Sequence, residues 1–357
     1  MLKHLAVMFS FALLLTQCAK HSTDQVDTLF EDYSGNKPGA AIMIIHDGEI
    51  ILNRCYGLAD MEQSIPVTDS SNFRLASMSK QFTAMAILQL MEKQKLTFST
   101  SLREVFPEFP AYAEDINYGH LLHHTSGLIA YENLIADSMT IPVLDADVLG
   151  LVLSVDSTYF EPGTAYRYSN TGYAILALTV ERLTGQTYPN YLETHIFGPL
   201  GMNGSLAYVR DDPDFPNRAL GYSVEGDSIL YSDQSMTSSV LGDGGIYSST
   251  RDLYKWDQAL YGTELILQAY LDSAFTPWLE DYGCGWRIEN YRGKKRISHT
   301  GSSCGFRTDY QRFPEDEFSV IILTNRRDPG VQVLAEVLTD IYLFGEAGIT
   351  KIDRRQP

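Results

Sequence analysis

The chain has 357 residues, of which 44% are hydrophobic and 20% are charged. This length and composition are typical of a large folded globule and argue against disorder, collagen and coiled coil. The 27 lysines and arginines against 45 aspartates and glutamates give a formal net charge of -18. Such a surface repels phosphate backbones, so we expect no nucleic-acid partner.

The first residues are typical of an export signal. The apolar run from Leu5 to Leu15 is too short to span a bilayer but suits the hydrophobic region of a signal peptide. Residues 15–18 resemble a bacterial lipobox, although a small residue usually precedes the cysteine. We expect a signal peptide at 1–17 and an exported mature chain at 18–357, in the periplasm or outer envelope. A lipid on Cys18 would be its only membrane anchor, and plain secretory cleavage nearby is the alternative.

Four cysteines are too few for a disulfide framework in a chain of this length. If Cys18 carries lipid, three cysteines remain and at least one thiol is unpaired. A bridge between Cys284 and Cys304 stays open, because a predicted turn lies between them.

The N-terminal part predicts a short helix, a hairpin and a buried helix. The helix candidate covers Asp24 to Tyr33. Two strand patterns, Ala41 to Ile45 and Ile50 to Tyr56, flank Asp47-Gly48, which is the strongest short hairpin signal. Residues from Met78 to Met91 are apolar on nearly every side, which indicates a central helix away from solvent.

The middle of the chain, from about 95 to 240, alternates helical patterns with proline and glycine punctuation. One helix is predicted over Tyr173 to Thr184, ending at Gly185. Strand patterns then return, and an amphipathic helix from Val331 to Leu343 is expected to cover the sheet. The four late strands are predicted at 282–289, 296–300, 306–313 and 318–324.

Strands at both chain ends with helices between them predict an α/β fold. Its antiparallel sheet would be formed from both chain ends, about 36–76 and 243–345, and flanked by helices. A mainly helical domain, about 95–240, would be inserted between them. Ligand pockets are often found at such junctions, so we expect the active site where the two parts meet.

Ser77 and Lys80 stand three residues apart at the start of the buried helix, so they share a face. Burial disfavours the charged lysine, and a neutral amine can accept the serine proton. Backbone N–H groups at a helix N-terminus can stabilise an oxyanion. By itself the spacing is weak evidence, because residues 34–37 repeat it. A capping serine followed by a solvated lysine is the plainer interpretation.

Tyr168 and Asn170 fall in an expected extended loop that ends before the helix at Tyr173. In extended chain, residues two apart point the same way, so a phenol and an amide would be presented together. Similar triplets at 131–133 and 188–190 make this pattern uninformative alone.

His299-Thr300-Gly301 occurs once, on a late predicted strand. Gly301 has no side chain, so a substrate backbone can lie against the strand edge. The N–H of Ser302 would then complete an oxyanion hole with the N–H of Ser77.

Together these motifs resemble the three signatures of the serine β-lactamase and penicillin-binding-protein family. The similarity is closest to the branch with class C β-lactamases, D-alanyl-D-alanine carboxypeptidases and related esterases. It implies a β-lactamase-like fold and hydrolysis through an acyl-enzyme. Further similar stretches extend it over nearly all the mature chain, at 121–128, 162–173, 197–202, 242–260 and 282–286.

The resemblance also implies a role for each motif residue. Ser77 would attack a carbonyl, and Lys80 and Tyr168 would share proton transfer, with the choice of general base left open. Asn170 would hold Lys80 and the substrate amide. No metal or organic cofactor is required. The remaining substrate-binding residues would be His299, Thr300, Gly301 and Ser302.

The third motif departs from the β-lactamase pattern, in which many members have lysine at the place of His299. Histidine is largely neutral at pH 7, so recognition of an anionic substrate should weaken unless Arg307 or Arg287 compensates. We therefore expect a small-molecule or peptide substrate with an ester or amide, such as a D-alanyl peptide, a D-amino acid amide or a small ester. β-Lactam hydrolysis and a penicillin-binding sensor without turnover are the alternatives.

Other candidates have plainer interpretations. His120, His123 and His124 include a pair four residues apart that could ligate a metal, but their surroundings suggest a structural segment. The glycine-rich stretch 242–245 lacks the Gly-Lys-Ser/Thr of a phosphate loop and is expected to form a tight turn near the cleft. Four tyrosines are candidates for lining a pocket: Tyr112, Tyr118, Tyr222 and Tyr247.

Overall fold

The computed structural model describes residues 25–210, 215–226, 228–327 and 330–346. The predicted signal peptide and Cys18 lie outside these residues. Within the described ranges, no helix combines the length and the apolar character needed to cross a membrane.

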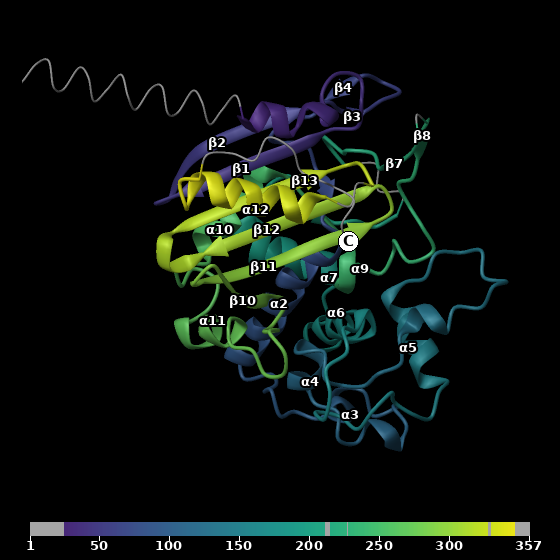
Figure 1. Ribbon diagram of the computed structural model, residues 1–357. Helices are drawn as coiled ribbons and strands as arrows, with labels where there is room; N and C mark the ends of the chain where they lie inside the picture. Colours follow the sequence, from purple (N-terminus) through teal and green to yellow (C-terminus); the bar gives the residue numbers. More distant parts are fainter. Residues whose placement is uncertain (1–24, 211–214, 227, 328–329, 347–357) are drawn as a thin grey trace, which may run out of the picture.

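The central element is a six-stranded antiparallel sheet in the order β10-β11-β12-β13-β1-β2 (Figure 1). Strand β1 from the N-terminal part pairs with β13 from the C-terminal part, with Ala40 opposite Thr324. The two chain ends therefore form one sheet, which confirms the predicted fold. The strands are β1 Ala40–His46, β2 Glu49–Tyr56, β10 Arg287–Tyr291, β11 Lys294–Ser303, β12 Phe306–Phe313 and β13 Phe318–Thr324.

Both faces of the sheet are covered, which explains why β1 is apolar without interruption. Met43 and Ile45 face one hydrophobic core, and Ile42 and Ile44 face the other. The second core is closed by the short helix at 25–29 and by α12 (Val331–Tyr342), which lies across the sheet in Figure 1. On the opposite face, α10 (Thr250–Ala259) contacts β1 and β13.

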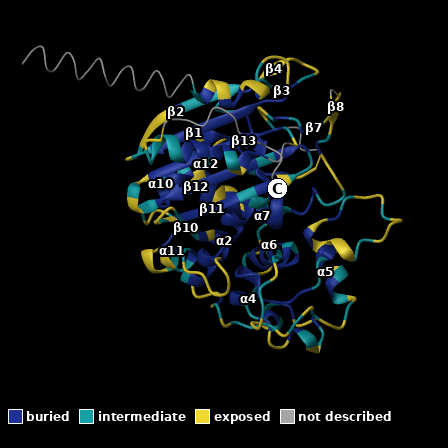
Figure 2. Cartoon of the chain, viewed as in Figure 1, coloured by how far each residue is buried: buried dark blue, intermediate teal, exposed yellow. Residues whose placement is uncertain are grey.

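The predicted central helix is present and buried. It comprises a 3₁₀ turn, η2 (Ala76–Ser79), followed by α2 (Lys80–Glu92). Every residue of α2 before Glu92 is buried, as the dark ribbon in Figure 2 shows. Phe82 packs on Trp256 of α10 with 4.4 Å between ring centroids. This helix therefore connects the sheet layer to the helical part below it.

Several predicted boundaries agree with the structure and others do not. The β1–β2 turn has positive φ at Asp47 (51°) and Gly48 (75°), as its sequence signal requires. The strand predicted from residue 282 begins only at Arg287. The reason is a close approach: a Cβ on Gly285 would meet the carbonyl oxygen of Lys80 at 2.6 Å. Gly285 therefore packs on α2, while Gly283 and Cys284 lie against Ala274, so this segment does not join the sheet.

The middle of the chain is mainly helical, and its long helix α6 ends at Gly185 as predicted. Three short strands that the sequence did not indicate also lie here, because strands of two to four residues carry no readable period: β6 (Leu206–Ala207), β7 (Tyr222–Glu225) and β8 (Ser228–Tyr231). The helical elements here are α3 Leu102–Val105, η3 Ala111–Ala113, α4 Tyr118–Leu122, η4 Tyr131–Asn133, α5 Asp145–Leu153, α6 Asn170–Thr184, α7 Tyr188–Leu192, η5 Glu193–Phe197 and α8 Gly198–Leu200.

Short elements complete the fold around the junction of the two parts. A three-stranded sheet in the order β5-β9-β6 lies beside the 3₁₀ turn that contains Ser77. The remaining elements are β3 Leu58–Asp60, β4 Ile65–Pro66, β5 Phe73–Arg74, β6 Leu206–Ala207, β7 Tyr222–Glu225, β8 Ser228–Tyr231, α9 Leu241–Gly244, β9 Ile246–Ser248, α11 Gln268–Ala274 and η6 Pro314–Asp316.

Candidate active site

Ser77 lies in the 3₁₀ turn between β5 and α2. The preceding residue, Ala76, has a φ of 51°, a left-handed conformation that costs on the order of 1 kcal/mol or more without glycine. Two hydrogen bonds to β9 hold the turn: Leu75 N donates to Ile246 O at 2.8 Å, and Ile246 N donates to Ser79 Oγ at 3.1 Å. The strained turn is therefore fixed from both sides of Ser77.

Lys80 is fully buried, and three oxygen atoms lie within hydrogen-bond distance of its Nζ atom. Its Nζ lies 3.3 Å from Ser77 Oγ, 2.8 Å from Asn170 Oδ1 and 2.6 Å from the backbone oxygen of Asp243. The predicted shared face of Ser77 and Lys80 is thus a direct contact. That contact is what proton transfer from the serine hydroxyl requires.

The Tyr168 side chain reaches the same lysine. The Nζ atom of Lys80 lies 4.9 Å from the centre of the Tyr168 ring. The Tyr168 phenol oxygen is buried and has no hydrogen-bond partner among the described residues. A buried hydroxyl without a partner is costly, so this phenol is available to a group that enters the site.

The local structure around Asn170 differs from the expected extended loop. Asn170 is the first residue of α6, because Ser169 caps the helix by accepting a hydrogen bond from Gly172 N at 3.1 Å. Its amide is oriented from both ends: Nδ2 donates to Glu132 Oε1 at 2.7 Å, and Oδ1 faces Lys80. Ser169, which lies between them, has extended backbone (φ -134°, ψ 110°), so Tyr168 and Asn170 both reach Lys80 as the alternation of an extended chain predicts.

His299 of the third motif is buried on β11. Its ring nitrogens contact the Tyr282 hydroxyl at 3.0 Å and the Thr300 carbonyl at 2.7 Å. Burial, with a further contribution from the Lys80 charge, lowers the pKa of His299 to about 3. The imidazole is therefore neutral at pH 7, as its residue type suggests, and β11 offers no cation at this position.

Gly301 is required by the packing of β11 against the chain that precedes Ser77. A Cβ at this position would lie 2.1 Å from Leu75 O and 2.2 Å from Thr308 Oγ1. Glycine thus lets β11 approach the chain just before Ser77. The close approach brings Ser302 to the cleft that contains Ser77. The approach of a substrate backbone to this strand edge stays a prediction.

A polar cleft opens at Ser77, and its lining includes residues that sequence reasoning missed. Arg74 precedes Ser77 closely and Asp243 lies in the glycine-rich turn, yet neither carried a signal of its own. The candidate tyrosines 112, 118, 222 and 247 are not among the residues that line this cleft. The lining residues are Arg74, Ala76, Ser77, Tyr131, Glu132, Asn170, Thr237, Asp243, Gly244, Ser302 and Ser303.

Asp243 is a buried carboxyl beside the lysine. Burial raises the pKa of its side chain to about 6, although the Lys80 charge opposes the shift. Its Oδ2 accepts a hydrogen bond from the Tyr131 hydroxyl at 2.9 Å. The predicted tight turn at 242–245 therefore lies at the cleft, where it supplies both a carboxyl and the carbonyl bound by Lys80.

Comparison with known proteins decides the family. The family model described as Beta-lactamase matches residues 26–341, which is most of the chain. The chain belongs to the β-lactamase family. The fold, the order of the motifs and the family match agree, and this β-lactamase-family protein is a serine hydrolase that acts on amides or esters.

Individual relatives of this β-lactamase-family hydrolase carry penicillin-binding and amidase names. Penicillin-binding protein 4* of Bacillus subtilis (strain 168) is 34% identical over 331 residues, covering 87% of this chain and 72% of that protein. A penicillin binding protein from Bacillus halodurans has a TM-score of 0.75 and 28% identity, covering 87% of this chain and 98% of that one. A D-amino acid amidase from Ochrobactrum anthropi shares the fold with a TM-score of 0.73 at 22% identity, covering 87% and 91%.

This chain does not span the full length of the curated relatives. The aligned parts cover 72% of penicillin-binding protein 4*, 61% of a putative penicillin-binding protein PbpX of the same strain and 66% of a protein Flp of Staphylococcus aureus.

The histidines of the 118–128 segment of this β-lactamase-family hydrolase have structural partners. His123 Nδ1 contacts Gly119 O at 2.9 Å and its ring stacks on Trp278 at 4.1 Å. His124 Nδ1 accepts a hydrogen bond from Ser169 N at 3.1 Å. Across the described ranges, no group of three or more histidine, cysteine or acidic side chains is placed to hold a metal ion.

The cysteines of this β-lactamase-family hydrolase do not form the bridge that the sequence left open. Cys55, Cys284 and Cys304 are all free thiols. Cys284 is buried with Sγ 3.8 Å from His123 Nε2, whereas Cys304 lies with Sγ 3.6 Å from Ser238 Oγ. The two thiols occupy separate environments, which sequence spacing could not reveal.

Proposed function

We propose that this protein hydrolyses an ester or amide through an acyl-enzyme on Ser77, with a D-alanyl peptide, a D-amino acid amide or a small ester as substrate. One observation carries the proposal: Lys80 Nζ contacts Ser77 Oγ at 3.3 Å and Asn170 Oδ1 at 2.8 Å while lying against the Tyr168 ring. A capping serine with a solvated lysine would not give this arrangement, because Lys80 is fully buried.

The chemistry follows from these contacts. The Ser77 hydroxyl loses its proton to Lys80, directly or with Tyr168 as partner, and Oγ bonds to the substrate carbonyl carbon. The N–H groups of Ser77 and Ser302 stabilise the oxyanion that forms. The bond to the leaving group then breaks as that group takes up the proton. Water attacks the acyl carbon, releases the acid and returns the proton to Ser77.

Tyr168 is well suited to proton delivery in this scheme. Its hydroxyl is buried without a partner among the described residues, so it need not break another hydrogen bond to reach the leaving group. A neutral Lys80 amine would keep its two N–H groups on Asn170 Oδ1 and the Asp243 carbonyl and direct its lone pair at Ser77 Oγ. We assign Lys80 to activation of Ser77 and Tyr168 to protonation of the leaving group.

The relatives support this substrate range. The 34% identical relative is named a penicillin-binding protein, and a structure with the same fold is a D-amino acid amidase. The penicillin-binding names favour a second candidate, a module that penicillin acylates without turnover. Many β-lactamases of the family have a lysine at this position, which helps to bind the anionic β-lactam. His299 is neutral and cannot supply that charge, which supports action on peptides or esters ahead of β-lactam hydrolysis.

The test is to profile the purified chain on 4-nitrophenyl esters, nitrocefin and D-alanyl peptides, beside labelling with a fluorophosphonate and a fluorescent penicillin. Turnover and labelling should vanish in Ser77→Ala. The matched control is Ser34→Ala, which removes the serine of the other Ser-x-x-Lys pattern and should retain both. A long-lived penicillin adduct without turnover favours the sensor. Full activity in Ser77→Ala refutes the site.

We also propose that the protein is exported and anchored by a lipid on Cys18, in the periplasm or outer envelope. The support is the apolar run from Leu5 to Leu15 followed by the lipobox-like residues 15–18. Fractionation of cells expressing the full chain should place it with membranes, and Cys18→Ala should release it to the soluble fraction. An unchanged distribution in that variant would argue against the lipid.

A further inference from the structure

His124 holds the backbone on both sides of Tyr168. Its carbonyl oxygen accepts a hydrogen bond from Arg167 N at 2.9 Å, and its ring nitrogen Nδ1 accepts one from Ser169 N at 3.1 Å. The imidazole also packs against the Tyr168 ring, with 4.3 Å between the ring centroids. The residues before and after Tyr168, and the Tyr168 ring itself, are thus all in contact with His124.

The backbone of His124 is strained where it makes these contacts. His124 lies in the loop after α4 and has a φ of 59°, a left-handed conformation that few residues with a Cβ adopt. The residue is also fully buried. A strained conformation persists only where its surroundings fix it, and strain of this kind is concentrated at functional sites. The strain therefore points to a role beyond the filling of space.

The hydrogen bond from Ser169 fixes the protonation state of the imidazole. Because Nδ1 accepts this bond, the single proton of the neutral ring is on Nε2. Protonation of Nδ1 would place two donors against each other and break the contact with Ser169. Burial, followed by the Lys80 charge, lowers the pKa of His124 well below 6.5, so the ring is neutral at pH 7.

The acceptor Nδ1 distinguishes this side chain from an apolar ring. The imidazole packs against the rings of Tyr282 and Tyr173, with 4.4 Å and 5.1 Å between centroids. Its Nε2 atom is buried and has no hydrogen-bond partner among the described residues. A buried donor without a partner is unfavourable, so a phenyl ring would serve packing alone better. What the imidazole adds is the hydrogen bond from the Ser169 N–H.

We propose that His124 is a positioning residue that aims the Tyr168 phenol at the leaving group. It does so through the two hydrogen bonds that fix the main chain on either side of Tyr168. This inference rests on the proposed function, in which Tyr168 protonates the leaving group. It gives a role in the reaction to a histidine that the sequence placed in a structural segment.

Activation of Ser77 has supports that do not include His124. Lys80 Nζ contacts both Ser77 Oγ and Asn170 Oδ1, and the Asn170 amide donates in turn to Glu132 Oε1 at 2.7 Å. These contacts hold the lysine from the side of α6 and η4. We therefore expect the serine to be activated even where the phenol is misplaced.

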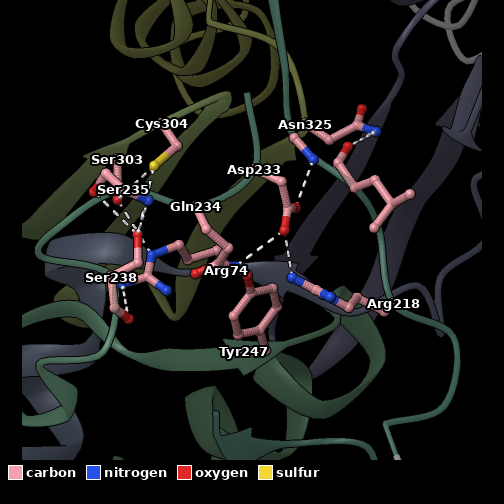
Figure 3. A network of polar contacts seen from close by, with 12 residues as sticks. Arg74, Arg218, Asp233, Gln234, Ser235, Ser238, Tyr247, Ser303, Cys304 and Asn325 are labelled. Carbon is pink, nitrogen blue, oxygen red and sulfur yellow. Dashed lines mark hydrogen bonds and ion pairs between the residues drawn. The ribbon is translucent and has the colours of Figure 1, made fainter. Parts of the chain in front are cut away.

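The sheet side of the cleft is also held without His124. Arg74 Nε donates to Ser303 Oγ at 3.2 Å, and Nη2 donates to the carbonyl oxygen of Ser238 at 2.9 Å (Figure 3). Among the described residues Arg74 forms no ion pair, so these hydrogen bonds fix its guanidinium. A change at His124 should therefore slow substrates whose leaving group needs a proton and spare those whose leaving group departs as an anion.

The first test uses two substrates that differ in their leaving group. An amine must be protonated to leave, whereas 4-nitrophenolate leaves as an anion, and kcat/KM reports only the steps up to that departure. In His124→Gln the amide oxygen lies one bond further from Cβ than Nδ1 does, so the acceptor is displaced. The kcat/KM of this variant should fall about a hundredfold on a peptide or amide that the wild type hydrolyses, and about fivefold or less on a 4-nitrophenyl ester. Equal losses on the two substrates would overturn the proposal.

Two further variants separate positioning from a general loss of structure. His124→Asn places an amide oxygen as many bonds from Cβ as Nδ1, and asparagine tolerates the left-handed backbone. It should restore kcat/KM on the peptide to within about tenfold of the wild type. The matched control is His123→Gln, because His123 is the neighbouring buried histidine and stacks on Trp278. It should leave the ratio of peptide to ester activity unchanged. If His124→Asn is as slow on the peptide as His124→Gln, Nδ1 has no such role.

A double variant tests whether His124 acts through Tyr168. Added to Tyr168→Phe, the His124→Gln change should cause about a twofold further loss or less on the peptide, because the phenol that it positions is already absent. A further loss as large as that of His124→Gln alone would place the function of His124 elsewhere and refute the inference.

A measurement without turnover separates this inference from the proposed function. Nitrogen-15 spectra of histidine-labelled Ser77→Ala at pH 7 should show a ring with protonated Nε2 and unprotonated Nδ1 that is lost when His124→Asn is added. The opposite tautomer, or an imidazolium, would refute the hydrogen bond from Ser169 and with it the role of His124. This result also decides the case in which His124→Gln fails to fold. If the wild type hydrolyses none of the substrates, the proposed function is refuted, and the tautomer still decides whether His124 holds Ser169.

Discussion

The Nζ atom of Lys80 lies 2.6 Å from the backbone oxygen of Asp243, and this carbonyl is held in place by a carboxylate nearly one hundred residues away. Asp145 of α5 accepts hydrogen bonds from Leu241 N at 2.8 Å and Gly242 N at 3.1 Å. The side chain of Asp145 thus holds the short helix α9 in place. This helix contains Asp243, whose carbonyl oxygen is one of the three oxygens near Lys80 Nζ.

Replacing Asp145 with Asn should weaken this indirect support. The amide keeps one acceptor but turns an NH₂ toward a backbone N–H, so we expect kcat to fall about tenfold with little change in KM, and stability to fall by roughly 1 to 3 kcal/mol. Steady-state kinetics and urea unfolding measure the two effects. The control is Asp147→Asn on the same helix, where Oδ2 caps Leu144 N at the exposed surface. A rise in KM with unchanged kcat would contradict a positioning role.

Asp243 should make the fold less stable as the pH rises. Its carboxyl has a pKa of about 6 in the folded protein against 3.8 as the reference value, so the folded state holds the proton more tightly. The stabilising contribution of the protonated carboxyl is fully present below pH 3.8 and is lost as pH rises through about 6, an effect of at most about 3 kcal/mol.

The isosteric variant Asp243→Asn isolates that contribution. It keeps the backbone oxygen bound by Lys80 and an acceptor for Tyr131. Urea unfolding of both proteins at pH 4.5 and pH 7.5 should show the variant gaining stability relative to the wild type at the higher pH. Identical pH dependence of the two proteins would show that this carboxyl does not titrate in that window.

Gly301→Ala should damage both the fold and the site. The new Cβ would lie 2.1 Å from Leu75 O, so β11 must move away from the turn that contains Ser77. We expect a hundredfold or greater loss of kcat/KM and a stability loss of about 1 to 3 kcal/mol, the usual cost of overpacking. Gly150→Ala is the control, since nothing lies within 4 Å of a Cβ there and the residue is helical. That variant should be stabilised by about 0.5 to 1 kcal/mol.

Tyr168→Phe should lower the activity without lowering the stability of the fold. The phenol oxygen is buried without a partner among the described residues, so its removal should leave the melting temperature unchanged or raise it. Activity on an amide substrate should fall by about 10²- to 10⁴-fold if the phenol transfers a proton. Tyr173→Phe gives the contrast, because that hydroxyl donates to Leu122 O at 2.9 Å and its loss should be destabilising. A destabilised, fully active Tyr168→Phe would exclude the proton-transfer role.

Much of the fold could be predicted where the pattern is local. Strands β12 and β13 agree with their predicted bounds because alternating or continuous apolar residues are enclosed by clear turns. The start of α6 was missed because the Ser169 cap acts through geometry and not through periodicity. The Tyr282–Glu289 strand was overextended because Gly285 packs on α2, a contact that only the folded chain contains.

In the candidate site, too, the residues of local motifs could be predicted, whereas contacts between distant segments could not. Ser77, Lys80, Tyr168 and Asn170 could be named from their spacing and order, and the structure brings them together at Lys80. The burial of Arg74, in contrast, depends on segments far along the chain, including Ser238 and Ser303. No local pattern in the sequence distinguishes an arginine that lacks a counter-ion from one in solvent.

The pairing of β1 with β13 has a consequence for the order in which the protein matures. A ribosome delivers Ser77, Lys80 and Tyr168 well before the strands that carry His299 and Ser302, and β1 has no neighbour on one side until β13 emerges. The wall that closes the cleft is thus synthesised long after the nucleophile. A polypeptide that ends before β11 would contain the nucleophile without the rest of its machinery, and hydrolytic competence would begin only after β13 has been synthesised.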